Sequence, residues 1–303
     1  MAMSGEVTTT DLCTGPGRVR WTSHLLSLVI ALGAGVYFCA FWVKVRPRMP
    51  DWMGWINRTS RTLVLPKIVQ AIEAMTGWEP TGRWTWAVVS LVLGAALPWL
   101  IMALIGRGRP RDIGLRWPNR VGYRLVIVGY LASLPFLVWM AWSPKVQAFY
   151  QRELAIEPWT RLYGPHVIVL FAEHLMFHGI LLAALRPGRR WPVVPTPVPA
   201  EGPALRRVLR WLGLAQPTGD ARGLVWLTRW IGLPDACVWA MVLQTALFGL
   251  VHAGKPPAEL AMSFPGGLAM AYVAYRCNGW LVPLVLHTAT AVTVLALVWL
   301  WSP

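Results

Sequence analysis

The run from His166 to Leu185 is apolar over a length that can cross a bilayer, yet Glu173, His174 and His178 lie at its centre. A charged side chain at the centre of a bilayer costs roughly 2.5–3.5 kcal/mol, so such groups usually mark function. His174 and His178 are one helical turn apart and would share a face of the predicted helix. We interpret the stretch as a functional site facing the protein interior or a wet cavity. The alternative is a buried polar cluster that only fixes helix register.

Other apolar runs of spanning length recur along the chain. Of the 303 residues, 56% are hydrophobic and only 14% are charged, which excludes disorder and an ordinary soluble enzyme. The sequence therefore predicts an all-α fold, a polytopic transmembrane helical bundle of about seven spanning helices, within a range of six to eight. The predicted spans are residues 25–43, 84–105, 125–142, 166–185, 236–251, 260–275 and 280–301.

The segments between the spans also carry patterns. We expect a polar N-terminal tail, residues 1–22, followed by one integral-membrane domain, residues 23–303. Within that domain, residues 63–75 predict an amphipathic segment at the membrane interface, and residues 143–165 predict a polar loop. Pro265-Gly266-Gly267 in the sixth span indicates a bend or a close approach of helices.

Residues 186–222 form a basic, proline-rich polar insertion. Near its end, Leu205, Val208 and Leu212 recur at helical spacing with arginines opposite, which predicts a short basic helix. That helix either lies on the membrane surface, in contact with anionic headgroups, or packs on the neighbouring spans.

The net charge of +15 lies mostly between the apolar runs. Basic residues there set membrane topology and attract anionic lipids, so the expected partner is a lipid bilayer with anionic lipids and not nucleic acid. More of the 28 lysines and arginines fall in loops on the side of the N-terminus, which predicts that the N-terminus is inside. The four cysteines form no CxxC pair, so we expect neither a disulfide framework nor a zinc knuckle.

Two more imidazoles lie at comparable depth on other spans. His252 follows the fifth predicted span and His287 lies within the seventh, so antiparallel helices can bring both near Glu173. A carboxylate among several imidazoles can hold and deprotonate a water, with Glu173 as the general base. Alternatively, His174, His178, His252 and His287 bind a divalent metal such as zinc, which acidifies the water. The residues alone leave both mechanisms open.

The order of these residues resembles the CPBP family of intramembrane proteases, also called the Abi or type II CAAX prenyl endopeptidase family. That family carries the motifs Glu-Glu-x-x-x-Arg, Phe-x-x-x-His and His-x-x-x-Asn. The corresponding segments here are Glu173-His174-Leu-Met-Phe-His178-Gly179, Phe248-Gly-Leu-Val-His252 and His287-Thr-Ala-Thr-Ala291. Ile113-Gly-Leu-Arg-Trp-Pro118 also resembles an upstream element of the family, and the resemblance covers about residues 105–295.

The resemblance implies a glutamic-type endopeptidase that cleaves a membrane-associated protein or peptide substrate. Glu173 would activate the water, and His252 and His287 would orient it, stabilise the oxyanion or bind a metal. The implied jobs are trimming of C-terminal sorting tails, as in a myxosortase-like branch, and CAAX-type processing. The implied location is the bacterial inner (cytoplasmic) membrane, which the chain crosses several times.

Three departures from the family pattern affect the predicted site. His174 replaces the second Glu, His178 replaces the Arg, and Ala291 replaces the Asn. One missing oxyanion donor typically costs about 10²–10³ in rate. Thr290 and Thr293 are the nearest candidates to replace the lost donor.

These departures keep two other functions open. A catalytically inactive relative would bind or escort another membrane protein. A metal-handling or proton-coupled transporter is the third alternative. Against a transporter, the charged groups within the spans are confined to one cluster, and no pair of broken helices in matching halves is evident.

Overall fold

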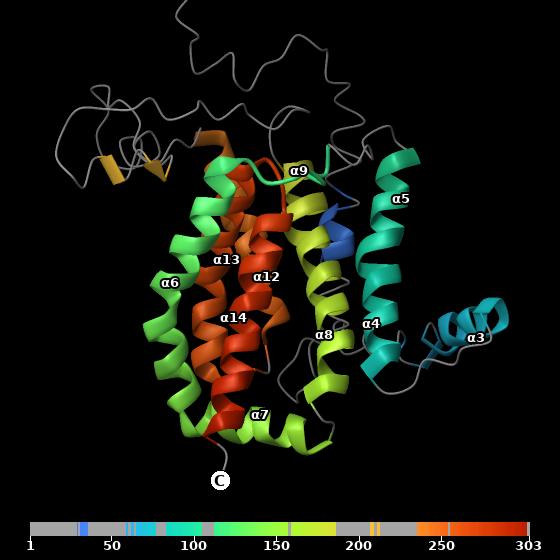
Figure 1. Cartoon of the computed structure of the whole chain (residues 1–303). Coiled ribbons are helices and arrows are strands. Elements are labelled where there is room, and N and C mark those ends of the chain that lie inside the picture. The colour runs from blue at the N-terminus through green and yellow to red at the C-terminus, as the bar shows by residue number, and fades with distance from the viewer. Residues whose placement is uncertain are drawn as a thin grey trace, which may run out of the picture.

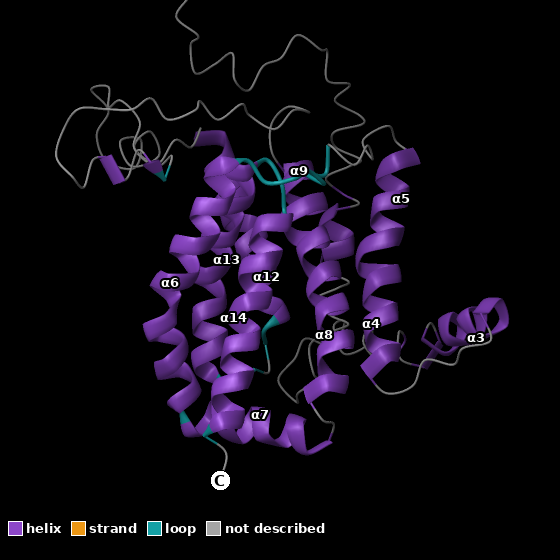
Figure 2. Cartoon of the chain, viewed as in Figure 1, coloured by secondary structure: helices purple, strands orange, loops and turns teal. Residues whose placement is uncertain are grey.

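The computed structural model describes Val29, Thr59 and residues 31–35, 62–63, 65–76, 83–104, 112–156, 159–185, 207–208, 211–212, 235–253 and 255–301. Within these ranges the regular elements are helices and no strand occurs, so the all-α prediction is confirmed (Figure 2). Most of the first predicted span, residues 25–43, and most of the insertion, residues 186–222, fall outside them.

Most of the predicted spans form helices close to their predicted places. The described helices are α3 (Leu65–Thr76), α4 (Arg83–Leu91), η2 (Val92–Ala96), α5 (Leu97–Leu104), α6 (Arg120–Trp142), α7 (Pro144–Ile156), α8 (Trp159–His174), η3 (Leu175–Leu181), α9 (Leu182–Leu185), α12 (Asp235–Val251), α13 (Pro257–Cys277) and α14 (Leu281–Leu300). Segments η2 and η3 are π-helical turns inside longer helices.

Four of the described helices are long and apolar enough to cross a membrane, judged by length and composition. They are Arg83–Leu104, Arg120–Trp142, Tyr163–Leu185 and Leu281–Leu300. The predicted fifth and sixth spans are the helices α12 and α13, which run beside the others in the bundle (Figure 1).

The helix that carries Glu173 lies inside the bundle. In Figure 1 the chain ascends through α4 and α5, descends through α6, crosses on α7 and ascends through α8 and α9. It then descends through α12, ascends through α13 and descends through α14. Helix α8 contacts α4 and α14, and η3 contacts α12 and α13. Every residue from Ala172 to Ala184 is buried. The predicted functional stretch is therefore enclosed by other helices and does not face lipid.

The prediction of a polar loop over residues 143–165 is wrong. The segment contains α7, which lies across one end of the bundle, and the first turns of α8 (Figure 1). Val146, Tyr150 and Leu154 recur every fourth residue and pack in the same cluster as Leu137 of α6. One apolar stripe at helical spacing folds this segment in spite of its polar composition.

Two other boundaries differ from the prediction for local reasons. Helix α6 begins at Arg120 instead of residue 125, because the Asn119 side chain accepts a hydrogen bond of 2.8 Å from the Gly122 amide and caps the helix. The predicted interfacial segment forms α3 from Leu65 onward, with Pro66 in the first turn, where proline is tolerated. Its position at the membrane interface stays a prediction.

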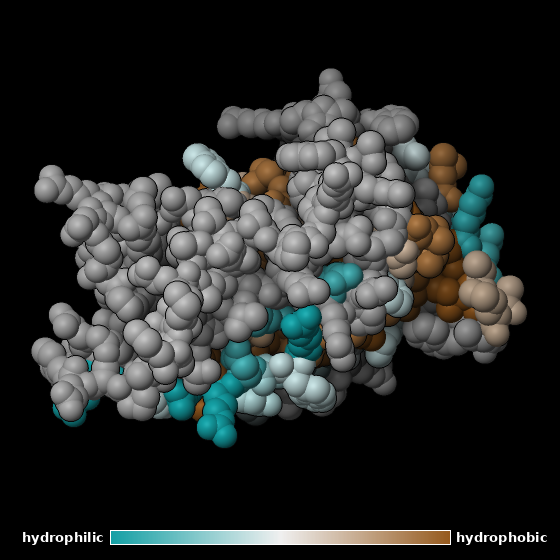
Figure 3. All heavy atoms as spheres, turned by 90° about the horizontal axis from the view of Figure 1, so that it is seen from above, coloured by the Kyte–Doolittle hydropathy of each residue, from teal (hydrophilic) through white to brown (hydrophobic). Residues whose placement is uncertain are grey.

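The end of the bundle at the start of α6 carries arginines. Figure 3 views the molecule from this side, with hydrophilic atoms between the grey ones and hydrophobic atoms along one flank. Arg124 donates to the Trp211 carbonyl at 2.9 Å, and its guanidinium carbon lies 4.7 Å from the centroid of the indole. Leu212 is buried in the same cluster as Val121 and Cys277. Of the predicted basic helix, Leu212 thus packs on neighbouring spans while Val208 is exposed, and contact with anionic headgroups stays a prediction.

Residues 112–119 dock against the turn between α13 and α14. The Trp280 amide donates to the Gly114 carbonyl at 3.3 Å, and Gly114 has a φ of 78°, which glycine adopts without steric cost. A Cβ at Gly279 would lie 2.6 Å from the Gly114 oxygen. A Cβ at Gly179 would lie 3.0 Å from the Ile113 oxygen. Close backbone approach therefore explains a glycine at the end of the first motif.

Replacing Gly279 by alanine is expected to destabilise the protein by about 1–3 kcal/mol, because the new methyl group meets a backbone oxygen that cannot rotate away. Thermal unfolding of the purified chain in detergent measures the effect. Gly33→Ala is the control, since a Cβ there meets no atom within 4 Å. Equal unfolding temperatures for the two variants would contradict the docking of residues 112–119 on this turn.

Candidate active site

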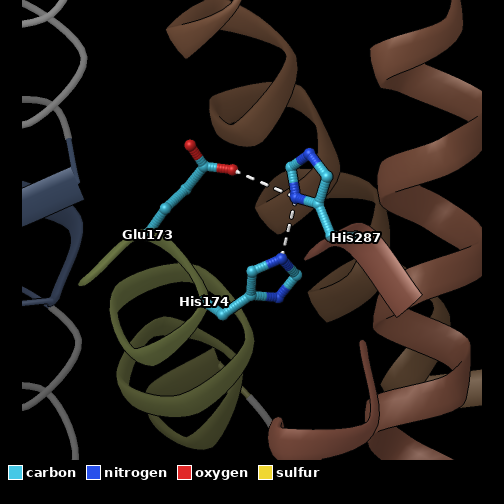
Figure 4. Close-up of side chains that lie close together, drawn as sticks. All are labelled: Glu173, His174 and His287. Carbon is cyan, nitrogen blue, oxygen red and sulfur yellow. Dashed lines mark hydrogen bonds and ion pairs between the residues drawn. The ribbon is translucent and has the colours of Figure 1, made fainter. Parts of the chain in front are cut away.

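Glu173 and His174 of α8 point toward His287 of α14 (Figure 4). The His174 Nε2 and His287 Nδ1 atoms are 2.9 Å apart, and a Glu173 carboxylate oxygen lies 3.7 Å from the same His287 nitrogen. The Glu173 side chain is 6% exposed and that of His287 is 17% exposed. The structure thus brings residues of the first and third motifs into direct contact.

The His178 ring stacks on the His174 ring, with centroids 4.6 Å apart and planes 19° from parallel. The π-helical segment η3 begins directly after His174, so the wider turn lies between the two rings. The His178 Nε2 atom lies 3.4 Å from Nε2 of Gln244 on α12. The two histidines share a face of the helix as predicted. His174 contacts His287, whereas His178 contacts Gln244.

The Phe248 ring of the second motif lies among all four imidazoles. Its centroid is 5.0 Å from that of His252, 5.3 Å from His178, 6.0 Å from His287 and 6.3 Å from His174. The Phe248 carbonyl lies 3.1 Å from His252 Nδ1 and accepts its proton, which leaves Nε2 of the neutral ring with a free lone pair. The four-residue spacing of the motif therefore orients His252 through the backbone and packs the cluster through the ring.

Helix α13 approaches α12 closely beside this ring. A Cβ at Gly267 would lie 2.8 Å from Phe248 Cδ1, and a Cβ at Gly249 would lie 2.6 Å from Phe264 Cε1. The close helix approach predicted from Pro265-Gly266-Gly267 is confirmed. Phe248 is only 2% exposed, so its ring has little room to move.

A tight turn follows α12 and carries a charged group near the cluster. The Lys255 amide donates to the His252 carbonyl at 3.0 Å. The Lys255 ammonium lies 2.8 Å from one oxygen of Glu259, and Tyr150 of α7 donates to the other at 2.9 Å. Burial lowers the pKa of Lys255, but Glu259, Tyr150 and Glu173 together raise it above its ordinary value. Lys255 therefore stays charged at neutral pH.

Three of these groups were missed by sequence reasoning. Gln244 and Thr245 are buried polar residues on α12, and their side chains are 3.4 Å apart. Gln244, Phe248 and His252 follow one another at intervals of four residues, so a search for polar groups on the His252 face would have found the glutamine. Lys255 and Glu259 are also four residues apart, so their pairing has a spacing signal in the sequence, whereas the contact with Tyr150 of α7 has none.

No hydroxyl takes the place of the motif asparagine in the described part of α14. Thr290 donates to the His287 carbonyl at 2.9 Å, within its own helix. Thr293 donates to the Ala289 carbonyl at 2.8 Å, and its oxygen lies 2.7 Å from the Tyr130 hydroxyl. Both threonine protons are thus used by backbone carbonyls. Among the described residues of α14, neither threonine hydroxyl is therefore left to replace the motif asparagine.

One group of side chains has the spacing needed to hold a metal ion. The ligand atoms of Glu173, His174 and His287 lie within 4.8 Å of one another. His178 and His252, which the sequence also offered as metal ligands, are not part of this group. The cluster can therefore act through a carboxylate base or through a bound cation.

Comparison with known families gives one match. Residues 209–293 match the family described as type II CAAX prenyl endopeptidase Rce1-like. The matched segment includes Phe248, His252 and His287, while the stretch around Glu173 precedes it. No curated protein and no solved structure matches the chain. The matched family consists of peptide hydrolases, and the four long apolar helices indicate an integral membrane protein. Over residues 209–293 the chain is therefore similar to the Rce1-like type II CAAX prenyl endopeptidases.

Proposed function

We propose that this chain is an intramembrane endopeptidase that hydrolyses a peptide bond of a membrane-associated protein with a water activated by Glu173. The convergence of residues from three helices supports this proposal most. Glu173 on α8 lies 3.7 Å from His287 on α14, and the rings of His287 and His252 are 6.3 Å apart. A buried carboxylate beside imidazoles is suited to proton transfer, and proton transfer is what peptide hydrolysis requires.

In this mechanism Glu173 accepts a proton from the water that attacks the scissile carbonyl. The carboxyl group then delivers that proton to the leaving amine, which restores the carboxylate. His252 accepts a hydrogen bond from the same water through its free Nε2 atom, because its Nδ1 proton is held by the Phe248 carbonyl. The water is thus oriented by one side chain and deprotonated by another.

His287 supplies the hydrogen bond to the developing oxyanion. His174 Nε2 donates to His287 Nδ1 across the 2.9 Å contact, which leaves the proton of the neutral His287 ring on Nε2. An N–H donor aimed at the oxyanion lowers the barrier because it meets charge that develops only in the transition state. His174 acts here as a positioning residue that selects the tautomer of His287.

The substrate is a protein or peptide associated with the membrane, cleaved in its C-terminal sorting tail or in a CAAX-type sequence. The location is the bacterial inner membrane, with the N-terminus inside and anionic lipids at the basic loops. The helix ends that flank residues 105–119 and 186–234 lie at the same end of the bundle as the α13–α14 turn, which agrees with this topology (Figure 1).

A comparison of protein termini by mass spectrometry tests the proposal. Membranes and medium from cells that carry the wild-type chain are compared with those from cells that carry Glu173→Gln at equal expression. We expect peptide ends that occur only with the wild type, and their sequences would identify the substrate class and the cleaved bond. Identical termini, with both proteins folded, would contradict the proposal.

A second candidate function is that of a catalytically inactive relative that binds or escorts a membrane protein. The observation that favours it is Ala291, together with the two threonine hydroxyls that already donate to backbone carbonyls of α14. Such a protein would retain a partner in co-purification equally well as the wild type or as Glu173→Gln.

A further inference from the structure

We propose that Glu173, His174 and His287 bind a divalent transition-metal ion of the zinc class, one ion to each chain. The inference rests on the proposed function of the same site and adds its cofactor. All three side chains point into one space between α8 and α14 (Figure 4). Their ligand atoms lie within 4.8 Å of one another, and the two residues from α8 are buried.

The separations suit a small cation. In a tetrahedral zinc site, with ligands at about 2.0–2.2 Å, neighbouring ligand atoms are about 3.3–3.5 Å apart. Here the two imidazole nitrogens are 2.9 Å apart, and the His287 nitrogen is 3.7 Å from the carboxylate oxygen. These two distances lie on either side of the tetrahedral value. The third pair, His174 Nε2 and the Glu173 oxygen, lies within 4.8 Å.

The chemistry of the donors favours zinc over magnesium or calcium. Two imidazole nitrogens and one carboxylate oxygen form a set that zinc prefers, whereas the harder cations prefer oxygen ligands alone. Three protein ligands also leave the fourth position for a water or a substrate oxygen, as catalytic zinc sites do.

An unpaired oxygen in the cluster also supports a bound cation. The Glu173 oxygen nearest His287 is buried and has no hydrogen-bond partner among the described residues. A cation at the centre of the group would bind this oxygen and would replace the hydrogen bond between His174 Nε2 and His287 Nδ1, which still leaves the proton of His287 on Nε2. Leaving a buried acceptor unsatisfied costs about 1–3 kcal/mol, and more for a charged group.

The departures from the family pattern favour a cation at this place. The family has Glu and Arg where this chain has His174 and His178. An arginine at 178 would hold a permanent positive charge one turn from the ligands and would repel a metal ion. A neutral imidazole removes that repulsion, and His178 itself is directed to Gln244. His252 is likewise occupied, through Nδ1, by the Phe248 carbonyl.

A bound ion would also offset the missing asparagine. A metal polarises a carbonyl oxygen and stabilises the oxyanion as a Lewis acid, which is the function that Ala291 cannot supply. Glu173 would hold the ion with one carboxylate oxygen, and its other oxygen could accept the proton of the attacking water. The base role of Glu173 and the metal site are therefore compatible.

Metal binding by the purified full-length chain in detergent tests the inference. The protein is stripped with a chelator and titrated with Zn²⁺, and the bound metal is measured by mass spectrometry of the elements. Co²⁺ is used in parallel, because its visible absorption reports tetrahedral nitrogen and oxygen ligands. We expect about one Zn²⁺ per wild-type chain. Glu173→Gln and His174→Gln should each weaken binding by more than the 10–100-fold that loss of an outer contact costs.

The matched control is His178→Gln, which changes the stacked neighbour of His174 and leaves the three ligands in place. We expect it to bind Zn²⁺ within about tenfold of the wild type, near the lower limit of outer-contact effects. Wild-type protein that binds no more Zn²⁺ than His174→Gln would overturn the metal site. Cleavage of substrate by such metal-free protein would leave the proposed function standing, whereas Zn²⁺ bound without any cleavage would leave the site and overturn the function.

Discussion

Glu173→Gln is expected to slow peptide-bond hydrolysis by about 10²–10⁴-fold, the range that loss of a general base produces. Glutamine has nearly the shape of glutamate but cannot accept a proton from water. The buried cluster around residues 172–184 should therefore keep its packing while it loses its base. The measurement is the initial rate of cleavage, by the purified protein, of a substrate found by comparison of termini.

Glu73→Gln is the control, because Glu73 is an exposed glutamate of α3, outside the bundle (Figure 1). It should cleave at the wild-type rate. Glu173→Asp should fall between the two, since a shorter side chain withdraws the carboxylate from the water, and a displacement of about 1 Å can cost about 10²-fold. A Glu173→Gln protein that retains the wild-type rate would exclude Glu173 as the base and as an essential metal ligand.

Gly267→Ala should both destabilise the protein and reduce its activity. The added methyl group would lie 2.8 Å from Cδ1 of Phe248 and 3.4 Å from Cγ2 of Thr245. Overpacking of this kind costs about 1–3 kcal/mol. Because the Phe248 ring lies among four imidazoles, its displacement moves the site as well, and we expect a rate loss of up to about 10²-fold.

The adjacent glycine provides a matched control. A Cβ at Gly266 meets no atom within 4 Å, so Gly266→Ala adds the same methyl group to the same helix without a collision. Alanine also favours a helix over glycine by about 1 kcal/mol, so this variant should unfold at the wild-type temperature or above it. The measurements are the thermal unfolding temperature and the cleavage rate of Gly267→Ala and of Gly266→Ala. If both lose activity equally, the contact between Gly267 and Phe248 does not control the site.

The helical bundle could be predicted from the sequence because the lengths of apolar runs report the spans directly. The predicted spans 84–105, 236–251, 260–275 and 280–301 end within about three residues of the observed helices. Helix α7 was missed because its apolar stripe consists of only three residues, Val146, Tyr150 and Leu154, and the residues between them are mostly polar. The π-helical turns were missed because nothing in the residue pattern distinguishes a wider turn from an α-helical one.

The sequence could predict which residues form the site, but it could not predict which side chains contact one another. Glu173, His252 and His287 were expected to meet from three helices, and the structure places both histidines beside Phe248 and Glu173 beside His287. Which histidine pairs with which group depends on the rotation of each helix about its axis. The segment η3 sets that rotation for His178 and directs it to Gln244. Such contacts arise only when the helices pack.

Helix α12 lies at the short end of the range of lengths that cross a bilayer. It has 17 residues, which span about 26 Å, while the hydrocarbon core is about 30 Å thick. The turn that follows it, from His252 to Lys255, therefore lies at a depth where unpaired backbone groups must be covered by protein or by water. Lys255, Glu259 and Tyr150 line this turn on the side of α7. The proposed hydrolysis consumes one water molecule for each bond that is cleaved, and a turn lined by these polar groups is a more favourable path for that water toward Glu173 than hydrocarbon is.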